Sequence, residues 1–175
     1  MNKSIRQYIG LAAAIVTYYV VHEGSHLIYA LITGVFKEIK FMGLGMQIDV
    51  YAENMSPTQL GEFCIVGSLA TFIVSYILVG YADKICKISS KVFKACIYYI
   101  TIALLLLDPI YLSVLYKFFG GGDMNGIKFL IPEVVAQIGY GVLLVINTVV
   151  FWKVVLPKYK HAFENVVKVS KRDEE

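Results

Sequence analysis

Charged residues are scarce in this sequence, and their scarcity limits what the chain can be. Asp, Glu, Lys and Arg make up 17% of its 175 residues and hydrophobic residues make up 58%. An average soluble domain is about 25% charged and about 45–50% apolar, so an ordinary water-soluble fold is excluded. Cysteine is also rare, because Cys64, Cys86 and Cys96 are the only three and form no CxxC pair. This usage argues against a disulfide scaffold and against a cysteine-based zinc ribbon.

The apolar residues are gathered into four long runs. The charged residues inside these runs are Glu23 in the first, Asp108 in the third and Glu133 in the fourth. A helix needs about 20 apolar residues to cross the bilayer core, and each run is long enough. The sequence therefore predicts an all-α polytopic membrane protein with four transmembrane helices near 8–34, 62–82, 94–117 and 129–155. Residues 1–156 would form one membrane-embedded domain, and residues 157–175 a polar cytoplasmic tail.

Lysine and arginine are distributed unevenly between the two ends of this helix layout. The end with the N-terminus, the second loop and the tail holds twelve of them, and the other end holds Lys37, Lys40, Lys117 and Lys128. Positive charge is typical of the cytoplasmic side of membrane proteins. We therefore expect a multi-pass cell-membrane protein with both termini in the cytoplasm. No basic and aromatic surface lies outside the membrane zone, so the expected contact is the lipid bilayer and not a nucleic acid.

The first loop predicts a small β-hairpin within residues 37–53. Apolar and polar residues alternate from Met46 to Glu53, a period of two that indicates a strand with one buried face. Ile39 and Phe41 suggest a partner strand, and Gly43-Leu44-Gly45 supplies the turn. We expect this hairpin at the non-cytoplasmic surface of the membrane.

The first apolar run contains His22-Glu23-Gly24-Ser25-His26, which has the HExxH pattern. Histidines four residues apart share one face of a helix, so both rings can bind one metal ion. Glu23 points about one residue's rotation away, where it can reach a water molecule at the metal without being a ligand. Zinc lowers the pKa of such a water to about 7, and the carboxylate can take its proton. Since Glu and His are costly inside a membrane helix, their location favours function over coincidence.

A catalytic zinc usually has three protein ligands, so a carboxylate is expected to join the two histidines. Asp108 and Asp123 are the strongest candidates. His22 and Asp108 lie at similar depths, about 24 Å and about 21 Å from the cytoplasmic ends of their helices at 1.5 Å per residue. Asp123 follows the third helix, but the glycine-rich stretch 120–126 allows its loop to turn back into the protein. Depth favours Asp108, and the unusual loop favours Asp123.

Taken together, these features resemble the site-2-protease-like family of intramembrane zinc metalloproteases. In that family HExxH lies in the first helix of a three-helix core, and a strand-rich loop with glycines follows, as in residues 40–53. Gly67-Ser68-Leu69-Ala70-Thr71 stands where the family has a Gly-Pro-x-x-Asn signature, with Ser for Pro and Thr for Asn. Gly122-Asp123-Met124-Asn125 resembles a variant of the last core element, although the usual Leu-Asp-Gly is absent. Asp108-Pro109 resembles the polar and proline element upstream of it.

The resemblance implies roles for individual residues. The family's last aspartate is its third zinc ligand, which implies zinc binding by His22, His26 and Asp123, with Asp108 as the reserve ligand. Glu23 is then the general base, and Asn125 is expected to donate a hydrogen bond to the substrate.

The same resemblance implies a zinc metalloendopeptidase that hydrolyses peptide bonds of membrane proteins or membrane-associated peptides. The hairpin would hold an unwound substrate segment as an added strand. The main alternative is a non-proteolytic membrane protein whose metal-binding or relict HExxH site serves a binding or chaperone role. Glu23 separates the two hypotheses, because a site that only binds metal does not need it.

Overall fold

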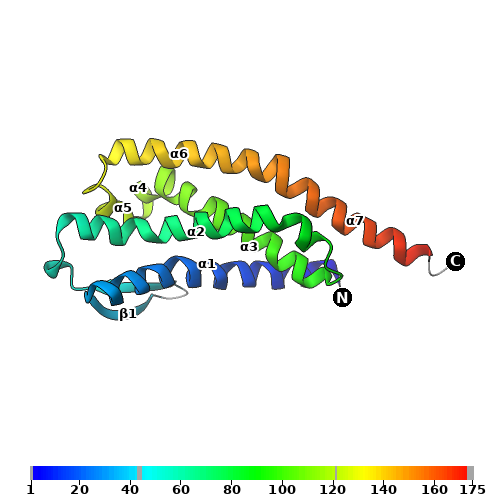
Figure 1. Cartoon of the computed structure of the whole chain (residues 1–175), viewed down its shortest axis with the longest axis horizontal. Helices are drawn as coiled ribbons and strands as arrows, with labels where there is room; N and C mark the ends of the chain where they lie inside the picture. The colour runs from blue at the N-terminus through cyan, green and yellow to red at the C-terminus, as the bar shows by residue number, and fades with distance from the viewer. Residues whose placement is uncertain (1, 43–44, 121, 173–175) are drawn as a thin grey trace.

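The computed structural model describes residues 2–42, 45–120 and 122–172, and it is mostly α-helical. Four long helices lie roughly along one axis (Figure 1). They are α1 (Lys3–Thr33), α2 (Pro57–Cys86), α3 (Lys91–Ile110) and α6 (Glu133–Val150). Helix α1 packs against both α2 and α3, and α3 packs against α6. The start of α1 and the C-terminal helix α7 (Leu156–Arg172) lie at the same end of this bundle (Figure 1).

Local sequence signals set the ends of these helices. Gly34 ends α1 with φ +73°, a left-handed conformation that glycine adopts without strain. Helix α2 begins with a capping box, in which the Ser56 side chain accepts from Gln59 N and the Gln59 side chain accepts from Ser56 N. Pro57 occupies the first turn, where its missing N–H has no consequence. Ser90 caps α3 by accepting from Phe93 N.

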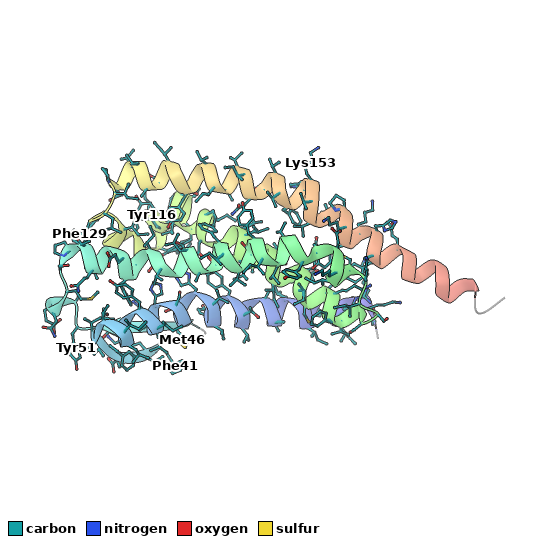
Figure 2. All side chains as sticks on the ribbon, viewed as in Figure 1. Phe41, Met46, Tyr51, Tyr116, Phe129 and Lys153 are labelled. Carbon is teal, nitrogen blue, oxygen red and sulfur yellow. The ribbon has the colours of Figure 1, made fainter. Side chains whose placement is uncertain are left out.

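The hairpin predicted in the first loop is confirmed. Strand β1 (Phe36–Met42) pairs antiparallel with β2 (Gly45–Val50), followed by the short 3-10 turn η1 (Ala52–Asn54). Ile48 is buried and Gln47 beside it is exposed, as the alternating pattern predicts. Phe41 projects away from the bundle (Figure 2). Of the predicted turn, residues 43 and 44 lie outside the described residues.

Helix α3 changes its hydrogen bonding after Pro109. Proline has no N–H to donate to the carbonyl of Leu105, four residues earlier. The side chain of Asn147 on α6 donates to this carbonyl at 2.6 Å, and its Oδ1 accepts from Tyr76 OH on α2 at 2.6 Å. A π-helical turn, η2 (Tyr111–Leu115), follows the proline. Asn147 therefore joins three helices at the point where α3 lost a backbone bond.

Two short helices follow this turn. They are α4 (Tyr116–Phe119) and α5 (Gly122–Ile127), and Gly120 between them has φ +81°. The reversal brings α5 back against α2. At the other end of the chain, α6 continues through a second π-helical turn, η3 (Phe151–Val155), into α7. The expected tail is thus helical to Arg172, and residues 173–175 lie outside the described residues.

Within the described part of the chain, three helices are long and apolar enough to cross a membrane: Pro57–Cys86, Lys91–Phe119 and Glu133–Glu164. They match the second, third and fourth expected spans. Helix α1 has 31 residues but is not among them. Its apolar residues are diluted by the polar pentapeptide 22–26. These three apolar helices are consistent with a membrane protein, and the expected fourth span is not among them.

Candidate metal centre

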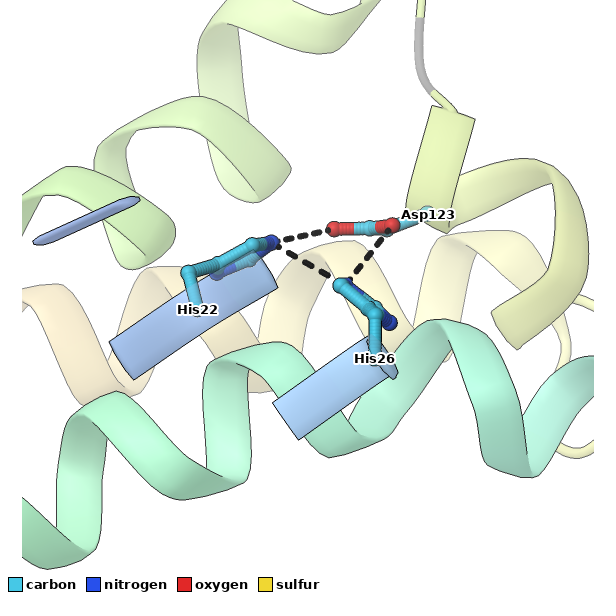
Figure 3. Close-up of side chains that lie close together, drawn as sticks. All are labelled: His22, His26 and Asp123. Atoms are coloured by element: carbon cyan, nitrogen blue, oxygen red, sulfur yellow. Dashed lines mark hydrogen bonds and ion pairs between the residues drawn. The ribbon is translucent and has the colours of Figure 1, made fainter. Parts of the chain in front are cut away.

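His22 and His26 lie on the face of α1 that is turned into the bundle. Their residues are 5% and 3% exposed, and their two Nε2 atoms are 3.2 Å apart. The spacing of four residues on one helix places both rings on the same side, as Figure 3 shows. Two imidazole nitrogens are thus directed at one point in the protein interior.

Asp123 reaches the same point from α5. Its Oδ2 is 3.1 Å from His22 Nε2, and its Oδ1 is 3.6 Å from His26 Nε2 (Figure 3). Close contact between α5 and α2 holds this helix inward, since a Cβ on Gly126 would lie 2.3 Å from Cys64 Sγ. His22, His26 and Asp123 therefore form a group of three side chains that could hold a metal ion.

Asp108 contacts the opposite nitrogen of His22. Its Oδ1 is 3.2 Å from His22 Nδ1, within ion-pair distance although not aligned as a hydrogen bond. Tyr18 OH donates to the same oxygen at 2.5 Å, and Thr71 Oγ1 donates to Oδ2. The carboxylate is 1% exposed and both of its oxygens are engaged. Asp108 thus supports His22 from behind, whereas Asp123 faces the nitrogens that the two histidines share.

The second histidine is also held from behind. His26 Nδ1 lies 2.7 Å from the carbonyl oxygen of Phe63, which can only accept. The ring proton must therefore sit on Nδ1, and the lone pair of Nε2 is left facing Asp123. Metal-binding histidines typically have such a partner, which fixes the tautomer and the ring orientation.

We call His22, His26 and Asp123 the donor group. Gly67 on α2 lies against its two histidines. A Cβ at this position would lie 2.5 Å from His26 Nε2 and 2.8 Å from His22 Nε2. Only a residue without a side chain lets the α2 backbone approach the donors this closely. The space beside the two nitrogens therefore exists because residue 67 is glycine.

The three donors suit a metal ion in both chemistry and spacing. The relevant atom pairs are 3.1, 3.2 and 3.6 Å apart. Tetrahedral ligands bound at about 2.0–2.2 Å are separated by about 3.3–3.6 Å. The two Nε2 atoms are slightly closer than this, and each faces a different oxygen of Asp123, so the group is near, but not at, the spacing of a formed site. Gly67 keeps the neighbouring space free of side-chain atoms.

Glu23 is tied to the hairpin. Its Oε2 accepts a hydrogen bond from Ile48 N on β2 at 3.2 Å, and its side chain is partly buried. Among the described residues, its other oxygen has no hydrogen-bond donor. The strand thus fixes one carboxylate oxygen of Glu23, the residue that follows His22 on α1, and leaves the second oxygen available.

The other downstream carboxylates are engaged elsewhere. Asp49 accepts from Lys40 at 2.6 Å, and this bond together with Lys37 holds the pKa of Asp49 below its usual value. Glu62 accepts from Tyr29 OH at 2.7 Å, and Asp83 pairs with Lys158 at 2.7 Å. None of these three carboxylates belongs to the group around His22 and His26.

Several residues of this centre were not predicted from the sequence. Tyr18, one helical turn before His22, is one of them. Thr71 and Gly67 were noted as a degraded motif without a role. The carbonyl of Phe63 leaves no signal in a sequence. The predicted substrate contact, Asn125, is exposed on α5, and its side chain has no hydrogen bond to another described residue.

The chain matches none of the family models, curated proteins or solved structures with which it was compared. Its function is therefore inferred from its own residues, and above all from the donor group His22, His26 and Asp123.

Proposed function

We propose that this protein is an intramembrane zinc metalloprotease that cleaves peptide bonds of membrane proteins or peptides. The observation that carries the proposal is the convergence of His22, His26 and Asp123 beside Glu23 among apolar helices. Two neutral imidazoles and one carboxylate favour zinc over magnesium or calcium, which prefer oxygen ligands. Three protein ligands also leave a fourth position for the reacting groups.

Zinc held by these donors supplies a Lewis acid, which polarises a peptide carbonyl and makes a water molecule acidic. The chain supplies the proton transfers. The free oxygen of Glu23 takes a proton from the attacking water and passes it to the amine that leaves. The hydrogen bond from Ile48 N holds the carboxylate in place for both transfers. General acid–base catalysis of this kind contributes about 10²–10⁴-fold to the rate.

In this proposal, Asp108 is a positioning residue that orients the His22 ring. A carboxylate behind a ligating histidine keeps the proton on the far nitrogen and raises the basicity of the ligand. The hydrogen bonds from Tyr18 and Thr71 keep Asp108 in place. Asp123 is the third ligand, and Asp108 does not share that role.

In this proposal, the reaction takes place within the membrane. Helix α1 is proposed as a fourth span, because apolar side chains such as Val16, Val20 and Ile28 are exposed along it. The hairpin lies beside Glu23, where an unwound substrate strand could pair with it, and Asn125 is proposed to donate to that substrate. The excess of lysine and arginine at the end with both termini supports a cytoplasmic position for that end.

The activity is tested by the variant Glu23→Gln. Membranes from cells that produce the wild-type chain are compared with membranes that carry this variant, and new protein N-termini are labelled and identified by mass spectrometry. New N-termini within membrane segments are expected with the wild type and at least 100-fold fewer with the variant, because Gln cannot accept the proton. Zinc content should be equal in both. The same termini in both samples would favour the non-proteolytic alternative.

The ligand assignment is tested by zinc analysis of the purified full chain. Asp123→Ala should lose zinc, because it removes a donor. Asp108→Ala should retain a site whose zinc affinity is about 10–100-fold weaker, since it removes only the support of His22. Asp83→Ala, which breaks an exposed ion pair, is the control and should bind zinc like the wild type. Equal losses in Asp123→Ala and Asp108→Ala would contradict the division of roles.

A further inference from the structure

A cleft lies at the end of the bundle opposite to the hairpin. The starts of α1 and α3 and the first turns of α7 meet there (Figure 1). Its volume is about 290 Å³. We name it the basic pocket, and the lining residues that matter here are Lys3, Arg6, Tyr98, Tyr99, Lys160 and Phe163.

The pocket is strongly positive. Lys3, Arg6 and Lys160 line it, and none of its described lining residues is acidic. The aromatic ring of Phe163 forms part of the wall, and the Arg6 guanidinium lies 5.3 Å from its centroid. Glu164, the next residue along α7, is exposed and does not line the pocket.

A fourth positive charge lies beneath the pocket. Lys94 is 1% exposed, with its Nζ 5.6 Å from the Phe163 ring centroid and 3.4 Å from the carbonyl oxygen of Ala162. No carboxylate of the described residues pairs with it. A buried ammonium group that is held only by a carbonyl and a ring leaves much of its charge uncompensated. Its field adds to that of the three cations above.

The surroundings of the pocket are apolar. Ala95, Leu156 and Phe163 contribute to its walls. On the same turns of α1, Ile5 and Tyr8 are 51% and 73% exposed and offer a surface to acyl chains. The three elements that form the pocket belong to the end with the excess of lysine and arginine, where the headgroups of the cytoplasmic leaflet would lie. Basic pockets between membrane helices at this level are typical sites for anionic lipid headgroups.

We infer that the basic pocket binds the phosphodiester headgroup of an anionic membrane lipid. Arg6 and Lys160 contact the phosphate oxygens from two sides, and Gln7 and the tyrosines supply neutral donors. The apolar residues next to the pocket hold the upper part of the acyl chains. The bound lipid then joins α1, α3 and α7 and does not touch the donor group at the other end of α1.

The test measures lipid binding by native mass spectrometry of the purified full chain in detergent. The probes are phosphatidylglycerol, phosphatidylcholine and inorganic phosphate. The pocket variant is Arg6→Gln with Lys160→Gln, and the control is Lys87→Gln with Lys153→Gln. The control removes the same number of charges from exposed positions outside the pocket, and Lys153 points away from the bundle (Figure 2).

The wild type and the control should bind phosphatidylglycerol at least tenfold more tightly than phosphatidylcholine. The pocket variant should lose at least tenfold of its phosphatidylglycerol affinity and retain its zinc content, which shows that it is folded. An equal loss in the control would show general charge attraction and overturn the proposal. Binding of inorganic phosphate as tight as that of phosphatidylglycerol would also overturn it, since the site would then take a free anion.

Discussion

Gly67 shows how one residue without a side chain can shape a candidate metal centre. Its Cα faces both imidazoles from α2, and an added methyl group would lie 2.5 Å from His26 Nε2. The rings cannot easily turn aside, because Phe63 O holds one and Asp108 lies behind the other. The two Nε2 atoms, which lie 3.2 Å apart, would have to move away from the methyl group, and one metal ion could then no longer bind both at about 2.0–2.2 Å.

We therefore expect Gly67→Ala to weaken zinc binding by at least tenfold. The measurement is a competition titration with a chromophoric chelator on the purified full chain. Gly80→Ala on the same helix is the matched control, because no atom of the described residues lies within 4 Å of its added methyl group. The control should keep its zinc affinity and gain about 0.5–1 kcal/mol of stability from helix propensity. An unchanged affinity in Gly67→Ala would show that the rings move aside freely.

At the residue scale, the sequence predicts which side-chain types form the candidate site, but not which role each carboxylate takes. The spacing of His22 and His26 predicts that they share a helix face, because helical periodicity depends on sequence alone. Asp108 and Asp123 could not be separated this way, since both are acidic and both can reach the depth of His22. The difference lies in which nitrogen each carboxylate approaches, and that depends on how α3 and α5 pack.

At the element scale, the parts with a strong local signal were predicted well. The hairpin follows from alternating residues, and α2 follows from an apolar run that begins after a capping box. Helix α1 is predicted as a span because Glu23 is the only charged residue in its apolar run. Its two histidines and this glutamate make it more polar than the three helices that are apolar enough to cross a membrane. The residues that make it a candidate for catalysis are those that weaken its membrane signal.

The π-helical turn after Pro109 is an element that the sequence does not reveal. The apolar run continues through it, so periodicity alone predicts an uninterrupted helix. Before the turn, the distant Asn147 binds the Leu105 carbonyl that the proline leaves free. Asn147 joins α6 to α3 and α2. The consequence for α3, and so for the position of Asp108 next to the proline, appears only when both helices are in place.

At the scale of the whole molecule, the fold separates two candidate sites along α1. The donor group lies near the hairpin and α5, and the basic pocket lies at the opposite end near the N-terminus. Both termini of the bundle lie at that basic end (Figure 1). An even number of spans is the arrangement that puts them there, which agrees with α1 as a fourth span. The metal centre would then face the non-cytoplasmic half of the membrane.

This orientation predicts which residues a reagent outside the cell can reach. In a chain with Cys64→Ala, Cys86→Ser and Cys96→Ser, one new cysteine is introduced at either of two exposed positions, Gln47→Cys on β2 or Lys87→Cys after α2. A membrane-impermeant maleimide on intact cells should label Gln47→Cys and reach Lys87→Cys only after the membrane is opened. The reverse pattern would place the hairpin, Glu23 and Asp123 at the cytoplasmic side. Equal labelling of both sites in intact cells would show that α1 does not span the membrane as proposed.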